Sequence, residues 1–248
     1  MDEFLTYIAV YQVITDLFDL IIGSGLIFGA LKWRKGLLTA TAFHWGIVLG
    51  SMGGIVFVYS TGGSPIYLLL FIGIGAILFP ILTYTVPAVN RFVLGFVVIM
   101  KLMYMFTTYM FKEGHMEIAP AIILPLICGM ILGIIFMFLK QMSVLPFVLG
   151  CSFIGASQYA ATLPKYINQF IFGITHDYSL LFDPIDFIFA LFKIELTDGW
   201  ALLIIIIFMC IGIPLQLKSV KNQGYSYDTP IITYETSDPN MHGKIISK

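Results

Sequence analysis

Four ionisable side chains lie within long apolar stretches of this sequence: Asp16, Asp19, His44 and Lys101. A charge at the centre of a bilayer costs about 3 kcal/mol on insertion scales, so each is a candidate functional residue. Asp16 and Asp19 are three residues apart and therefore share one face of a helix. We hypothesise that one of them pairs with Lys101 inside the protein, beside a hydrated cavity. The alternative is that both carboxylates lie in the membrane interface while Lys101 extends its ammonium toward the surface.

His44 directly precedes Trp45 in the second apolar stretch. Its imidazole could relay protons or bind a ligand if polar groups from other helices face it. The polar residues near it in sequence are Thr39, Thr41 and Ser51. The simpler interpretation is a packing histidine that hydrogen-bonds a backbone carbonyl.

No other residue pattern predicts catalysis, metal binding or nucleic-acid binding. The sequence contains no HExxH, GxSxG or P-loop motif, so we expect no catalytic residue and no enzymatic activity. Cys128, Cys151 and Cys210 lie in apolar runs without a CxxC or His/Cys cluster, so we expect no metal and no cofactor. A formal net charge of -1 provides no basic surface for nucleic acid.

The composition places the chain in a membrane. Of the 248 residues, 59% are hydrophobic and 11% are charged. Soluble domains carry about 25% charged residues, and a water-soluble fold could not bury such an excess of apolar side chains. The lipid bilayer is therefore the first expected partner, and the chain is expected to be an integral protein of the cell membrane.

Seven apolar stretches reach the length of about 20 residues that a spanning helix needs. They predict an all-α, polytopic membrane bundle of about seven transmembrane helices, and prolines inside four of them predict kinks. The predicted spans are Val10–Leu31, Gly36–Tyr59, Pro65–Tyr84, Ala88–Met110, Ile118–Leu139, Val144–Leu163 and Trp200–Leu217. The prolines are Pro80, Pro125, Pro146 and Pro214.

Lys and Arg residues flanking these spans predict the orientation, because they favour the cytoplasmic side. Seven lie on one side of the predicted membrane: Lys32, Arg34, Lys35, Arg91, Lys140, Lys218 and Lys221. Three lie on the other: Lys112, Lys165 and Lys193. The bias predicts an outer N-terminus and a cytoplasmic C-terminus.

The regions outside the spans are short. Residues 1–9 carry two acids and no Lys or Arg, unlike a signal peptide, and are expected to form a short outer N-terminus. The transmembrane domain covers residues 10–217. Within it, residues 165–199 mix aromatic and acidic side chains and predict an outer amphipathic or re-entrant segment. Residues 218–248 are polar and predict a flexible cytoplasmic tail.

Glycines four residues apart predict close helix packing, since small residues let backbones approach in lipid. The hairpin over residues 23–54 carries two such pairs, one on each helix, and residues 129–133 repeat the pattern. We therefore expect three hairpins, each formed by an odd-numbered helix and the helix that follows it, plus one closing helix. The expected packing glycines are Gly25, Gly29, Gly46, Gly50, Gly129 and Gly133.

The hairpin sequence GSGLIFGALKWRKGLLTATAFHWGIVLG has two looser echoes, GIGAILFPILTYTVPAVNRFVLG and GMILGIIFMFLKQMSVLPFVLG, and the last helix ends IGIPLQLKSVKNQG. Together they resemble the TM7S3/TM198-like family, also called the DUF4203 domain, over residues 10–222. The resemblance implies a seven-pass membrane domain with its amino end outside. An animal member of that family looks like a scaffold that helps kinases reach a Wnt co-receptor.

Two functional hypotheses follow. The first is a non-enzymatic membrane protein that acts through helix packing, either as a homo-oligomer or with a partner membrane protein. Its support is the dense GxxxG content. The second is a small-solute or ion transporter or channel that uses Asp16, Asp19 and Lys101 at membrane depth.

Overall fold

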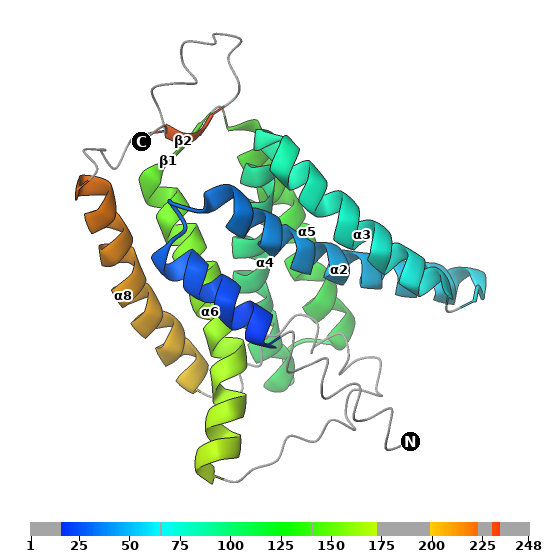
Figure 1. Ribbon diagram of the computed structural model, residues 1–248. Coiled ribbons are helices and arrows are strands. Elements are labelled where there is room, and N and C mark those ends of the chain that lie inside the picture. The colour runs from blue at the N-terminus through cyan, green and yellow to red at the C-terminus, as the bar shows by residue number, and fades with distance from the viewer. Residues whose placement is uncertain (1–15, 65, 140, 173–198, 223–229, 234–248) are drawn as a thin grey trace.

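The computed structural model describes residues 16–64, 66–139, 141–172, 199–222 and 230–233, and these are almost entirely helical (Figure 1). Residues 16–28 form the first helix. The elements that follow are α2 (Arg34–Thr61), α3 (Ile66–Thr85), α4 (Pro87–Lys112), α5 (Ile118–Phe138), β1 (Gln141–Ser143), α6 (Val144–Phe172), α8 (Gly199–Asn222) and β2 (Pro230–Thr233).

Six helices of the described chain, α2 to α6 and α8, are long and apolar enough to cross a membrane. The predicted all-α membrane bundle is therefore confirmed. The predicted span Val10–Leu31 begins outside the described residues, and its described part is helical to residue 28.

Two helices run five or more residues past their predicted ends. α6 continues from Leu163 through Pro164 to Phe172, and α8 continues from Leu217 to Asn222. The length of an apolar run matches the thickness of the hydrocarbon layer, whereas a helix with its backbone hydrogen bonds can continue beyond that layer into the interface. The expected outer segment 165–199 therefore begins as the last turns of α6, while residues 173–198 lie outside the described part of the chain.

A short antiparallel sheet joins the loop before α6 to the expected tail. Gln141 of β1 lies opposite Thr233 of β2, and Met142 lies opposite Ile232. The prediction of a flexible tail over 218–248 did not include this strand, which forms from the β-branched run PIIT. The rest of the expected tail beyond Asn222, and residues 1–9, are outside the described ranges.

The helices pack in three pairs, α2 with α3, α4 with α5, and α6 with α8. Three pairs agree with the expected number, but the pairing is shifted by one helix from the prediction, and α6 and α8 are joined through residues outside the described part of the chain. The additional helix is the first and not the last. It packs on α6 through Gly155, whose Cβ position would lie 2.6 Å from the Gly23 carbonyl oxygen, and on α8 through Gly212, next to Ile27.

The tightest approach joins α2 to α3. A Cβ atom on Gly46 would overlap the carbonyl oxygen of Gly75, and a Cβ on Gly75 would overlap the carbonyl oxygen of Gly46. One turn further along α2, a Cβ on Gly50 would overlap the carbonyl of Phe71. These glycines therefore bring two backbones of the same chain into direct contact.

The glycines of α5 pack on aromatic side chains of α4. A Cβ on Gly133 would lie 2.9 Å from the Phe92 ring, and one on Gly129 would lie 3.1 Å from the Phe96 ring. Gly29 differs from the expectation, because its nearest neighbour is the side chain of Trp33 in the turn, whereas Gly25 packs on the side chain of Leu37 in α2. The first helix ends at residue 28, so Gly29 lies in the turn, where its carbonyl accepts hydrogen bonds from the next residues.

The proline positions explain where kinks are possible. Pro80, Pro125 and Pro214 lie inside α3, α5 and α8, as predicted. Pro146 is the third residue of α6, where the first-turn N–H groups have no intrahelical partner, so it has no hydrogen bond to remove. Pro164 is inside α6 instead.

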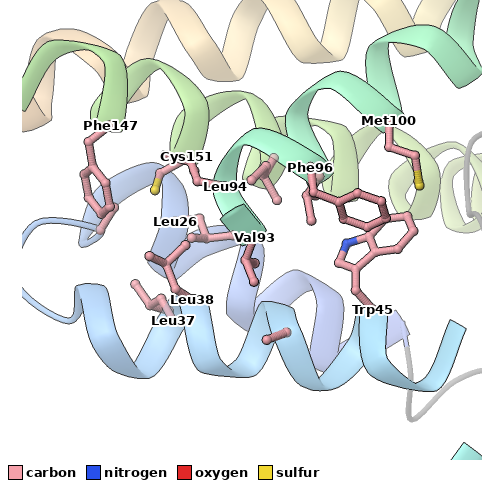
Figure 2. Packing of buried hydrophobic residues seen from close by; sticks show 14 of the residues in the cluster. Leu26, Leu37, Leu38, Trp45, Val93, Leu94, Phe96, Met100, Phe147 and Cys151 are labelled. Atoms are coloured by element: carbon pink, nitrogen blue, oxygen red, sulfur yellow. The ribbon is translucent and has the colours of Figure 1, made fainter. Parts of the chain in front are cut away.

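The largest apolar core lies between the first helix, α2, α4 and α6. Figure 2 shows Leu26, Trp45, Phe96 and Phe147 within it. Trp45 of α2 meets the ring of Phe96 edge-on, with ring centroids 6.0 Å apart. Helix α6 is central, because 78% of its 18-residue apolar stretch is buried in the protein. Helix α3 is peripheral, with 6% of its corresponding stretch buried.

Candidate functional site

Polar side chains, most of them buried, lie on α6 and on the helices around it. We define the α6 polar column as Ser152, Ser157, Gln158, Thr162 and Tyr166 of α6, together with Asp16, Asp19, Ser24, His44, Lys101 and Gln216 from the surrounding helices. From Ser152 to Tyr166 is 14 residues. At 1.5 Å per residue the column is about 21 Å long, against a hydrocarbon thickness of about 30 Å.

The two aspartates of the first helix face different neighbours. Asp16 is 3% exposed, and its Oδ2 accepts a hydrogen bond of 3.4 Å from the Tyr166 hydroxyl of α6. Asp19 is 1% exposed, and its Oδ1 lies 3.7 Å from His44 Nδ1 of α2. Both carboxylates therefore lie inside the protein.

His44 brings α2 into the column. Its side chain is 19% exposed, and its ring also meets that of Trp45 edge-on, with centroids 5.7 Å apart. The simpler interpretation, a histidine bonded to a carbonyl, did not include an acidic neighbour. An imidazole beside a buried carboxylate is a pair that can hold or pass a proton.

Lys101 lies inside the bundle. It is 4% exposed, and its Nζ donates a hydrogen bond of 2.7 Å to Ser157 Oγ. Ser157 Oγ in turn donates to the carbonyl of Ile154 at 2.7 Å. The ammonium is therefore held at mid-column and does not extend to the membrane surface.

The predicted ion pair between Lys101 and Asp16 or Asp19 stays a prediction. Ser157, which holds Lys101, is nine residues from Tyr166, which bonds Asp16. That separation is about 13 Å along α6. Asp19 is one turn closer to Lys101, because the first helix runs antiparallel to α6, and it is the better partner of the two.

At the other end of the column, Gln216 of α8 holds the end of the first helix. Its Nε2 donates to the carbonyls of Leu26 and Ile27, at 3.0 and 2.7 Å, and approaches Ser152 Oγ at 3.2 Å. The last carbonyls of a helix have no intrahelical partner. Gln216 therefore replaces water as the cap of a helix that ends inside the protein.

Three oxygen atoms on uncharged side chains of the column are buried without a hydrogen-bond partner in the described chain: Gln158 Oε1, Thr162 Oγ1 and Gln216 Oε1. A buried acceptor that stays unsatisfied costs about 1–3 kcal/mol. Ser24 and Tyr159 hydrogen-bond to each other beside them. The three oxygens can therefore accept hydrogen bonds from water or coordinate a cation that enters the column.

Three further buried polar residues differ from the sequence-based prediction. Gln158 and Gln216 carry no charge and so were not considered, although a glutamine inside an apolar run is itself a signal. Arg91 was counted among the surface cations, but it is fully buried at the start of α4 and donates to the carbonyl of Met137 at 3.3 Å.

Among the described residues there is no group of three or more His, Cys, Asp or Glu side chains that could hold a metal ion. The three cysteines carry free thiols, with Cys151 buried and Cys210 exposed.

Comparison with known proteins shows no match to any family model, curated protein or solved structure. The resemblance to the TM7S3/TM198-like family stays a prediction.

Proposed function

We propose that this membrane protein is a transporter or channel in which a small ion or solute passes along the α6 polar column. The observation that supports the proposal is the column itself. Two carboxylates, an ammonium and an imidazole lie around the most buried helix of the bundle. Ionisable groups inside a membrane protein commonly mark substrate and ion pathways.

Stability alone is a poor reason for such a set. Apolar residues of similar size often stabilise a protein as well as buried charges do, or better. Neutral hydrogen-bonding groups in the same column, such as Gln158 and Thr162, have acceptor atoms unused by the described chain. Transport needs both features, because the moving species must lose its hydration shell and find other ligands inside the membrane.

We also propose that the protein is not an enzyme. Lys101 and Ser157 are in contact, and a Ser–Lys pair can act as base and nucleophile. Here the lysine donates to the serine, and the serine proton is directed to the Ile154 carbonyl. A general base must instead accept the serine proton, and this arrangement leaves Ser157 unactivated.

The test is flux into liposomes that contain the purified protein, under a pH, Na⁺ or K⁺ gradient and with a panel of small solutes. The parent protein is expected to transport at least one of them. Lys101→Met should lower that flux at least tenfold, while Ile77→Ala on the exposed face of α3 should not change it. Liposomes as tight as protein-free ones throughout the panel would overturn the proposal.

A second function, self-association or binding of a partner membrane protein, is favoured by α3. The predicted support for it was the GxxxG content, but Gly46, Gly50 and Gly75 are used between helices of the same chain. Gly73 of α3 instead has open space at its Cβ position. If a second copy packs there, crosslinking in membranes should capture a dimer that Gly73→Leu abolishes. A dimer retained in that variant would contradict this interface.

The orientation is likewise a proposal. Lys32, Arg34, Lys35, Lys218 and Lys221 belong to the same end of the bundle, which we call the basic end, since Leu31, Val144 and Val220 pack together there. We place this end in the cytoplasm of the cell by the Lys and Arg bias. Because Arg91 is buried, the bias rests on the other cations. Labelling of Lys35→Cys by an impermeant thiol reagent in intact cells should fail, in a background where Cys128, Cys151 and Cys210 are replaced by alanine.

A further inference from the structure

We propose that Asp19 and His44 form a reversible proton-binding site and that the proton is the ion that this column moves or uses to drive a solute. The second part rests on the proposed transport function. The first part concerns binding alone and can be tested without transport.

The geometry of the pair supports proton exchange. Asp19 Oδ1 and His44 Nδ1 are 3.7 Å apart, slightly beyond a direct hydrogen bond, and a small rotation of either side chain would close the gap. Asp19 is buried, whereas His44 is partly exposed. The imidazole is therefore the less buried group of the pair.

The charged residues nearest to the pair belong to the first helix and to α4. Asp16 is three residues from Asp19, and Lys101 of α4 is buried and bonded to Ser157. Arg91 is a second buried cation of α4.

The described side chains of α6 and α3 are uncharged. Tyr159 and Tyr166 of α6 are neutral phenols, and α3, which packs on α2, has no charged residue. On α8, Lys218 and Lys221 lie at the basic end, beyond Gln216. Asp16, whose Oδ2 accepts a hydrogen bond from the Tyr166 hydroxyl, is the nearest other carboxylate.

A proton fits this site better than a metal cation. Sodium and similar hard cations need several oxygen ligands around one point, and a nitrogen ligand suits them poorly. Asp19 instead faces an imidazole, and no cluster of metal-ligating side chains occurs among the described residues. Imidazole and carboxylate are both proton acceptors.

The transfer is a simple acid–base step. Nε2 of the imidazole accepts a proton from hydronium, which becomes water, and Nδ1 gives its own proton to Oδ1 of Asp19. No electron is exchanged and no co-reactant is needed. Thr162 and Gln158, whose oxygens are unsatisfied in the described chain, are the next hydrogen-bond acceptors along α6 toward Lys101 and could orient a water that carries the proton onward.

Proton binding is tested by infrared difference spectroscopy of the purified protein during a pH titration. We expect the C=O stretch of a protonated carboxyl to appear on acidification, to be lost in Asp19→Asn, and to shift its midpoint in His44→Gln. His115→Gln, an exposed histidine in the turn after α4, is the matched control and should behave as the parent. A carboxyl signal that neither Asp19→Asn nor His44→Gln alters would overturn the proton site.

Flux then tests the use of the proton. With a pH-sensitive dye inside liposomes, a pH gradient should drive transport in the parent, at least tenfold less in His44→Gln, and none in Asp19→Asn. Flux that follows a Na⁺ gradient and ignores pH would overturn the coupling to protons while the transport function stands. Absence of any flux would overturn the transport function and the use of the proton, and the infrared result would still decide proton binding.

Discussion

Helices α3 and α6 are both long enough to cross a membrane, but they occupy opposite places in the molecule. Helix α3 contains no charged residue, and 6% of its 18-residue apolar stretch is buried. Helix α6 carries Ser152, Ser157, Gln158 and Thr162 at buried positions, and 78% of its 18-residue apolar stretch is buried. The helix with more polar residues is inside, and the more apolar one is outside.

The difference shows which force sorts the helices. In water an apolar helix would be buried first, but lipid solvates α3 as well as a protein interior does. Lipid cannot hydrogen-bond the side chains of α6, so these must find partners in the protein. Close packing then holds α3 in place, whereas polar contacts hold α6.

The largest expected effect is the loss of the α2–α3 contact. In Gly75→Leu the new side chain would overlap the Gly46 backbone, and two helix backbones cannot yield as a side chain can. We expect a loss of at least about 3 kcal/mol of stability. Thermal unfolding in detergent, followed by size-exclusion chromatography, measures it.

The matched control is Gly73→Leu, two residues away on α3, where the Cβ position is open. This variant should unfold within about 0.5 kcal/mol of the parent. Equal destabilisation by both variants would mean that α3 does not present Gly75 to α2.

A smaller effect should separate buried from lipid-facing isoleucines. Ile154 of α6 is fully buried, whereas Ile77 of α3 is 64% exposed. Ile154→Ala should cost about 2 kcal/mol because it leaves a cavity, whereas lipid chains or detergent can fill the space left by Ile77→Ala. Unfolding in a denaturant series measures both, and a larger loss for Ile77→Ala would reverse the assignment of inside and outside.

The hydrogen bonds of Gln216 should contribute less again. Gln216→Leu removes the donor to the carbonyls of Leu26 and Ile27 and should cost about 1–2 kcal/mol. Ser152→Ala removes a single, longer contact and should cost less. Hydrogen exchange at the end of the first helix reports the change locally, and unchanged exchange in Gln216→Leu would show that this end has another cap.

The smallest expected effect is the coupling between Lys101 and Asp19. In a double-mutant cycle of Lys101→Met and Asp19→Asn, the predicted ion pair should give a coupling energy of about 1 kcal/mol. Thermal unfolding of the parent, both single variants and the double variant supplies the four values. If each single variant unfolds like the parent, no buried pair exists.

The helix positions could be predicted from sequence because an apolar run is a local property. The start of α5 at Ile118 and of α6 at Val144 agree with the predicted residues. The pairing of helices could not be predicted in the same way. Each helix follows one neighbour and precedes another through short connectors, and Gly46 and Gly50 do not indicate toward which neighbour they point.

The candidate site was predicted in part for a related reason. Charged residues in apolar runs are conspicuous, so Asp16, Asp19, His44 and Lys101 were found. Their contacts were not, since Asp19 meets His44, and Lys101 meets Ser157, across long separations in sequence. Gln158 and Gln216 were missed because a neutral amide costs little in a hydropathy sum, although it needs hydrogen-bond partners as a charge does.

The small sheet has a mechanical consequence for the membrane interior. β1 ends at Ser143, and α6 begins at the next residue, Val144, with no loop between them. A displacement of β2 would therefore be transmitted to the first turn of α6 by rigid backbone. Chemical modification or binding near residues 230–233 would strain the helix that carries the buried polar groups, without touching any of those groups directly.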